Sequence, residues 1–101
     1  AADDGVDVAG RLFELLGRDR RRLASGKRST VAALQLLDLL PDHPVVTVPR
    51  VMKLLKITAP TARKAVEIGA EAGILRETSG KQRDRVFAYH KYLQILTGEE
   101  A

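Results

Sequence analysis

The chain has 101 residues, of which 45% are hydrophobic and 30% charged, and its 17 Lys and Arg outnumber its 13 Asp and Glu. This composition is typical of one soluble globular domain, and no apolar run approaches the roughly 20 residues of a membrane-spanning helix, so a disordered tail and a membrane protein are excluded. Because the chain lacks cysteine, it cannot form disulfides or thiolate zinc sites, and a packed core must stabilise it.

The chain begins Ala-Ala-Asp-Asp, without methionine and without a charged-then-apolar leader. We therefore expect a cytoplasmic location and a piece of a longer protein. The positive charge is concentrated in two places, at residues 17–28 and at residues 47–73. Bases that share one face of a fold attract phosphate, so the fold decides what this charge means.

The first predicted element is an amphipathic helix over residues 6–23, which Gly17 is expected to interrupt. The basic run from Arg18 to Arg22 is interpreted as the solvated end of this helix, because cations near a helix C-terminus are favourable. The apolar residues that recur at helical spacing are Val8, Leu12, Leu15, Leu16 and Leu23.

A second helix is predicted from a cap at Ser29 or Thr30 through Leu40, and Pro41 and Pro44 mark its exit. The β-branched pair Val45-Val46 follows and predicts a small strand.

Two further helices are predicted on either side of a tight turn. Thr47 caps the first, which has Pro49 in its first turn and is about nine residues long. The connection covers residues 56–58, and Thr58 caps the next helix, which runs to about Ala72.

The later of these two helices has a predicted inner face of small residues, which allows neighbouring elements to approach closely. Its outer face is expected to carry Thr61, Arg63, Lys64 and Glu67. The inner face consists of Ala62, Ala65, Val66, Gly69 and Ala72.

After Gly73 the pattern predicts a β-hairpin with strands at residues 74–78 and 85–89 and a polar tip at 79–84. A short helix around residues 90–96 and an acidic tail complete the chain.

The order helix, short strand, helix, tight turn, helix, hairpin predicts a mainly α fold with a small β-hairpin, namely a winged helix-turn-helix preceded by an N-terminal helix. The predicted division is a helical connector at residues 1–28, the winged helix-turn-helix at 29–97 and a tail at 98–101. In such a fold the third helix of the core enters the major groove of DNA, and the hairpin is the wing.

The sequence therefore predicts a DNA-binding, transcription-regulatory domain whose main partner is double-stranded DNA. Arg63 is the expected base reader because its planar fork can contact guanine twice, whereas Lys64 suits phosphate and Thr58 and Thr61 lie beside them. On the wing, Lys81, Arg83 and Arg85 are expected to contact the backbone or minor groove. The carboxylates of Glu67, Glu71 and Asp84 dilute this charge and predict weak or cooperative binding.

Enzymatic interpretations find little support, and we expect no catalytic residue, metal or cofactor in this chain. The stretch Ser25 to Thr30 resembles a phosphate loop, but Arg21 and Arg28 stand where the motif needs glycine and a hydroxyl residue. The two histidines, His43 and His90, lie in different segments with no cysteine near them.

The stretches at residues 46–66 and 72–89 resemble the C-terminal region of Fic-family proteins, in which a winged helix follows the catalytic domain. The likeness covers most of residues 10–97, is most specific from Gly80 to Tyr89, and implies core positions at Ile57, Ala62, Val66 and Ile74. It also implies a parent protein that transfers AMP from ATP to a protein hydroxyl through a motif H-P-F-x-x-G-N-G-R. That motif is absent from these residues, so the chain would be the accessory domain alone.

The main rival hypothesis is a protein-interaction module that binds no DNA. In that case Leu12, Leu15 and Leu16 of the first helix would pair with a second copy of the chain or dock on the Fic catalytic domain in cis. An exposed apolar stripe on this helix would favour the rival.

Overall fold

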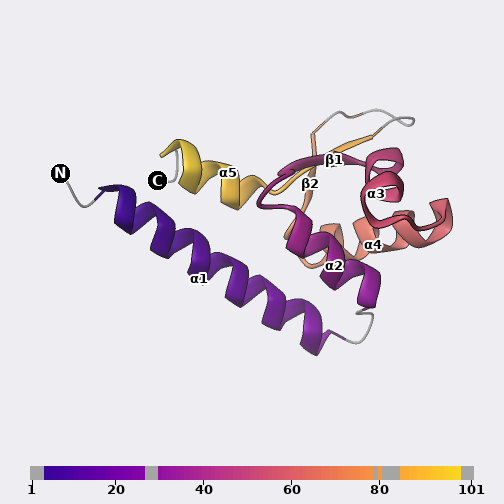
Figure 1. Ribbon diagram of the computed structural model, residues 1–101, viewed down its shortest axis with the longest axis horizontal. Coiled ribbons are helices and arrows are strands. Elements are labelled where there is room, and N and C mark those ends of the chain that lie inside the picture. Colours follow the sequence, from indigo (N-terminus) through magenta and orange to yellow (C-terminus); the bar gives the residue numbers. More distant parts are fainter. Residues whose placement is uncertain (1–3, 27–29, 79, 81–84, 99–101) are drawn as a thin grey trace.

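The helices and strands of the chain follow the predicted order. The computed structural model describes residues 4–26, 30–78, 80 and 85–98 (Figure 1). Within these residues the elements are α1 (Asp4–Ser25), α2 (Val31–Leu39), β1 (Val45–Thr47), α3 (Val48–Leu55), α4 (Ala59–Glu71), β2 (Arg76–Glu77), β3 (Val86–Ala88) and α5 (His90–Thr97).

The predicted fold class is confirmed, since the fold is mainly α with a small antiparallel sheet behind an N-terminal helix. The strand order is β1-β3-β2, so the hairpin strand β3 lies in the middle of the sheet. Val45 of β1 pairs with Ala88 and Val46 pairs with Phe87. The strand before the helix-turn-helix is thus joined to the hairpin that follows it.

α1 continues through Gly17, so the predicted interruption is wrong. A glycine inside a helix costs only about 1 kcal/mol relative to alanine. Leu15 and Leu23, on either side of Gly17, are buried in the core. Tertiary packing on both sides of the glycine therefore outweighs its weak helix propensity.

One core joins α1 to the remaining elements. α1 packs against α2 and α5, and α2 packs against α4. In Figure 1, α1 runs along one side of the molecule with α5 beside it, while α3 and α4 lie at the other end from α5. The predicted division of the chain at residue 28 stays a prediction, but α1 belongs to the same core as the helix-turn-helix. Its members include Leu15, Leu23, Leu36, Leu37, Leu40, Val46, Val51, Val66 and Ile74.

A buried polar pair fastens α1 to the C-terminal part of the fold. The Tyr89 hydroxyl donates to the Asp19 carboxylate at 2.6 Å, and both side chains are buried. Burial, and then the hydrogen bond and charge of Asp19, raise the pKa of Tyr89 well above its usual value. Tyr89 also stacks on Tyr92, with ring centroids 5.5 Å apart.

The strands of the hairpin are shorter than predicted because Ile74 and Leu75 cap α4 instead of extending β2. Gly73 adopts a positive φ of 79°, and the N–H groups of Ile74 and Leu75 then both donate to the Gly69 carbonyl. This is how a left-handed glycine ends a helix. Both residues consequently turn into the core, and β2 begins only at Arg76.

Candidate nucleic-acid interface

The turn between α3 and α4 is closed by left-handed backbone at Lys56, with a φ of 57°. The N–H groups of Lys56 and Ile57 both donate to the carbonyl of Met52. Left-handed backbone costs a residue other than glycine roughly 1–2 kcal/mol. The turn thus holds a lysine where glycine would fit with less strain.

α3 starts as the sequence predicts, since the Thr47 hydroxyl accepts from the Arg50 N–H at 3.3 Å and Pro49 lies in the first turn. Thr58 occupies the corresponding position before α4, but its side chain makes no capping bond, so that part of the prediction is wrong. Its hydroxyl lies 3.0 Å from the Thr61 hydroxyl instead. Both hydroxyl groups are on exposed residues, at the entrance to α4.

The first two turns of α4 present Thr61, Arg63 and Lys64 to solvent, as predicted. They do so because Ala62 and Ala65, on the opposite side, have no exposed surface and pack under α2 and α3. The inner face is confirmed except that Ala72 is only half-buried and that Ile68, which the sequence interpretation missed, is buried. The site residues predicted for this helix therefore lie together.

Three cations of α3 and its turn were not singled out from the sequence. Arg50, Lys53 and Lys56 are all exposed, while Val51 on the same helix is fully buried. The helical spacing of three residues keeps the cations on one side of α3. In helix-turn-helix proteins this first helix crosses the DNA backbone, so these residues extend the candidate interface.

All charged residues of α3, its turn and the first turns of α4 are basic. From Val48 to Lys64 the chain has five bases, all exposed, and no acid. The first carboxylate is that of Glu67, further along α4. This run of bases without acids was the signal in the sequence that could have identified the α3 cations.

Of the three predicted wing residues, Arg85 lies among the described residues. Lys81 and Arg83 lie outside the described residues, so their prediction stays untested. Arg85 is exposed before β3, but its Nε lies 3.2 Å from the Glu77 carboxylate, which also accepts from the Gly80 N–H at 2.6 Å. Glu77 thus offsets the charge of Arg85, the one predicted wing residue that lies among the described residues.

The described residues contain no cluster of three or more His, Cys, Asp or Glu that could hold a metal ion. His90 begins α5, and its Nε2 lies 3.4 Å from the Gly73 carbonyl. Among the described residues, no helix has the length and apolar character needed to cross a membrane.

Comparisons with known protein families and with curated proteins found no match to this chain. The resemblance to Fic-family proteins accordingly stays a prediction from the residues quoted above.

Proposed function

We propose that the chain binds double-stranded DNA, with the first turns of α4 in the major groove and α3 along the phosphate backbone. The observation that carries this proposal is the stretch from Val48 to Lys64, where five exposed cations occur without a carboxylate. Phosphate contacts by such cations release counterions from DNA, which favours binding. The major groove is wide enough to admit a helix such as α4.

The residues of this surface have two proposed roles, contact with DNA bases and contact with DNA phosphates. Arg63 reads bases, because a guanidinium can donate two hydrogen bonds to guanine. Arg50, Lys53, Lys56 and Lys64 bind phosphates, which adds affinity that depends on salt but little sequence preference. Thr58 and Thr61 serve the same surface as hydroxyl donors.

The wing contributes through Lys81, Arg83 and Arg85 in this proposal. Because Arg85 is paired with Glu77, its contribution is reduced. Glu67 further along α4 also weakens the attraction to phosphate, so the proposal includes modest affinity for a single copy of the chain.

The test is binding of a labelled duplex to the full chain, measured by fluorescence anisotropy across a salt series. The four phosphate contacts of Arg50, Lys53, Lys56 and Lys64 predict a slope of roughly −3 to −4 in log K against log salt concentration, which wing contacts would steepen. The double variant Arg50→Gln/Lys53→Gln is expected to reduce the magnitude of this slope by about 2.

The matched control is Arg21→Gln, which removes an exposed cation from α1. It is expected to leave the slope nearly unchanged. No binding at low salt, or an equal loss per charge in the control and the α3 variant, would contradict the proposal.

A second candidate function is protein interaction through α1. The leucine stripe that was expected to pair with another chain is occupied internally, because Leu15 is buried and Leu12 and Leu16 are packed against the core. Phe13, however, is 81% exposed and borders a hollow lined in part by Leu37 and Pro41.

Sedimentation of the chain and of Phe13→Ala tests this alternative. A dimer that Phe13→Ala disrupts would support self-association through α1. A monomer at high concentration in both cases would count against it.

We further propose, on the resemblance of residues 46–66 and 72–89 alone, that the chain serves as the accessory domain of a Fic-type AMP-transferase. The AMP transfer then belongs to a catalytic domain outside these residues, because His43-Pro44 is followed by Val45-Val46 and no glycine-asparagine-glycine follows. The reading frame that contains this chain tests the proposal. It must encode an H-P-F-x-x-G-N-G-R motif upstream, and its absence there would refute the assignment.

A further inference from the structure

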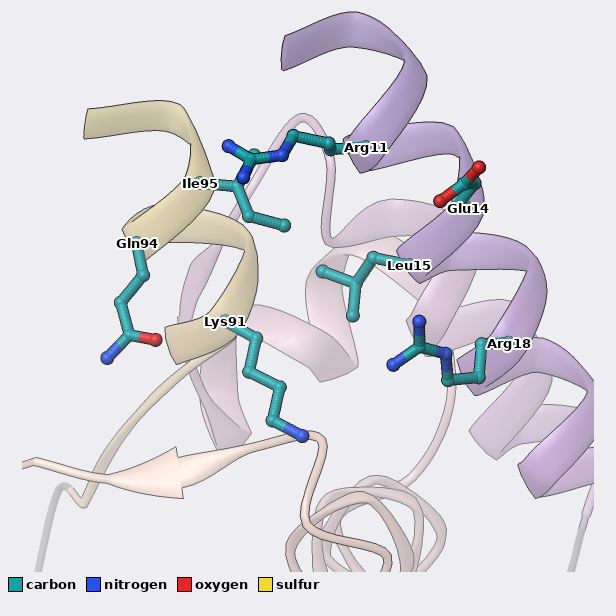
Figure 2. Close-up of a pocket in the computed structure, with 7 residues that line it drawn as sticks. All are labelled: Arg11, Glu14, Leu15, Arg18, Lys91, Gln94 and Ile95. Carbon is teal, nitrogen blue, oxygen red and sulfur yellow. The ribbon is translucent and has the colours of Figure 1, made fainter. Parts of the chain in front are cut away.

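A hollow of about 380 Å³ lies between α1 and α5 (Figure 2). We call it the α1–α5 hollow, and it is lined by residues of both helices. α1 contributes Arg11, Glu14, Leu15 and Arg18, while Lys91, Gln94 and Ile95 come from α5. In Figure 1, α5 lies at the other end of the molecule from α3 and α4, so the hollow is separate from the candidate nucleic-acid interface.

The base of the hollow is apolar. Leu15 and Ile95 point toward each other from the two helices (Figure 2), and both are buried members of the core. They are the two apolar residues among the seven that line the hollow, and because both are largely covered, the apolar surface at its base is small. The base therefore offers a limited apolar contact to a ligand that the polar rim holds.

Three cations and one carboxylate, that of Glu14, surround the hollow, so its rim has a net positive charge. The Arg18 guanidinium and the Lys91 ammonium extend from opposite helices into the same space, and Arg11 lies above them (Figure 2). Within the described part of the chain, neither Arg18 nor Lys91 has a hydrogen bond or ion pair with another described residue. Two cations that face one space without a carboxylate between them raise its affinity for an anion.

We propose that the α1–α5 hollow binds a small organic phosphate monoester, with the phosphate between Arg18 and Lys91 and the apolar body over Leu15 and Ile95. Two facing cations match the two negative charges of a phosphate monoester. A ligand with a single carboxylate would neutralise only one of the two cations. A guanidinium suits a phosphate because it can donate two parallel hydrogen bonds. The Gln94 amide on α5 supplies a further polar group at the rim.

Occupation of the hollow links the two helices that Asp19 and Tyr89 already join. Arg18 precedes Asp19 in α1, and Lys91 lies two residues after Tyr89, whose hydroxyl binds Asp19. A phosphate held by both cations would act beside that bond and stabilise the docking of α5 on α1. The ligand is therefore expected to raise the melting temperature of the protein, since it binds the folded state alone.

Phenyl phosphate is the probe, and calorimetric titration of the full chain measures its binding. Inorganic phosphate, which lacks the apolar body, and phenol, which lacks the charge, are the comparison ligands. Phenyl phosphate is expected to bind saturably and at least about tenfold more tightly than either, because both the cations and the apolar base contribute. Amide NMR shifts are expected to be largest in α1 and α5.

Arg18→Gln and Lys91→Gln are each expected to weaken this binding by about tenfold, since each removes one charge-assisted contact. Arg21→Gln removes the same charge from an exposed position of α1 outside the hollow and is expected to change the affinity less than about twofold. Thermal unfolding without ligand checks that all three variants fold.

The proposal would be overturned by the absence of saturable phenyl phosphate binding, by equal affinity for phenyl phosphate and inorganic phosphate, or by an equal loss in Arg21→Gln and the two hollow variants. Shifts confined to α3 and α4 would place the phosphate on the candidate nucleic-acid interface and would also refute it.

Discussion

Gly69 of α4 lies directly against Leu75, so that a Cβ atom on the glycine would stand 2.9 Å from Leu75 Cδ1 and 3.3 Å from its Cγ. The contact is tight because Leu75 folds back to donate its N–H to the Gly69 carbonyl at 3.1 Å. The small residue in the centre of α4 thus lets the chain reverse direction immediately after the helix.

Gly69→Ala is expected to destabilise the protein. Overpacking of the buried Leu75 costs about 1–3 kcal/mol, which exceeds the gain of about 1 kcal/mol from better helix propensity. Gly17→Ala is the control, because its Cβ would meet only Arg21 Nη1 at 3.5 Å and should raise the free energy of unfolding. Urea denaturation measures both. A Gly69→Ala protein as stable as Gly17→Ala would contradict the packing described here.

Tyr89→Phe is expected to lower the free energy of unfolding by about 2–3 kcal/mol, because the buried Asp19 carboxylate loses its hydrogen-bond donor. Tyr92→Phe is the matched control. The Tyr92 hydroxyl donates to the Pro41 carbonyl at 3.3 Å from a half-buried position, so its loss should cost about 1 kcal/mol or less. An equal decrease in the free energy of unfolding in both variants would contradict the proposed stabilising role of the Tyr89–Asp19 hydrogen bond.

The raised pKa of Tyr89 predicts a loss of stability at high pH. Above about pH 10 the unfolded chain releases the phenol proton while the folded chain retains it, so the free energy of unfolding falls by about 1.4 kcal/mol per pH unit. Below that pH both states keep the proton, and this group contributes no pH dependence. Tyr89→Phe lacks the effect.

The stability advantage of the unmodified chain over Tyr89→Phe should consequently shrink between about pH 10 and pH 11 and stay constant at lower pH. Denaturation of both proteins in the same buffers measures the difference and cancels the titration of the lysines and of Tyr92. A constant advantage up to pH 11 would refute the prediction.

The side-chain caps of Thr30 and Thr47 are expected to stabilise the protein more than Thr58, whose side chain makes no capping hydrogen bond. The Thr30 hydroxyl accepts from the Ala33 N–H at 3.1 Å, and the Thr47 hydroxyl from the Arg50 N–H at 3.3 Å. Thr30→Ala and Thr47→Ala should each cost about 1 kcal/mol of stability. Thr58→Ala should cost clearly less in the same denaturation experiment, because its hydroxyl caps no backbone group of α4.

Within the proposed DNA complex, Arg63→Ala should change the sequence preference of binding, whereas Lys53→Ala should change only the overall affinity. Arg63→Ala is expected to cost about 1–3 kcal/mol on a preferred duplex and to relax the sequence preference. Lys53→Ala should weaken all duplexes alike and reduce the salt slope by about 1. Competition between preferred and scrambled duplexes separates the two effects, and the same profile for both variants would contradict the assigned roles.

The sequence predicted the helices well where local chemistry determines them. Thr30 and Thr47 cap the helices that they were expected to cap, and the inner face of α4 follows from the spacing of its small residues. The prediction was wrong at Gly17, where tertiary packing keeps the helix continuous. It was also wrong at Ile74 and Leu75, where the left-handed Gly73 ends α4 and turns both residues into the core.

The polar contacts were harder to predict, because their partners are distant in the chain. Asp19 lies within the run from Arg18 to Arg22 that was interpreted as solvated, but it is buried and lies four residues from both Leu15 and Leu23 on the apolar stripe of α1. That position indicates burial, but nothing local identifies Tyr89 as its partner. The pairing of Arg85 with Glu77 likewise depends on the register of the hairpin, which the sequence left open.

The pairing of β1 with β3 also determines the order in which the fold can assemble. Val45 finds its partner Ala88 only after the entire helix-turn-helix and the hairpin have been synthesised. Closing so long a loop costs chain entropy that local helix formation does not. The individual helices are thus able to form before β1 pairs with β3, so that the sheet depends on contacts between distant parts of the chain.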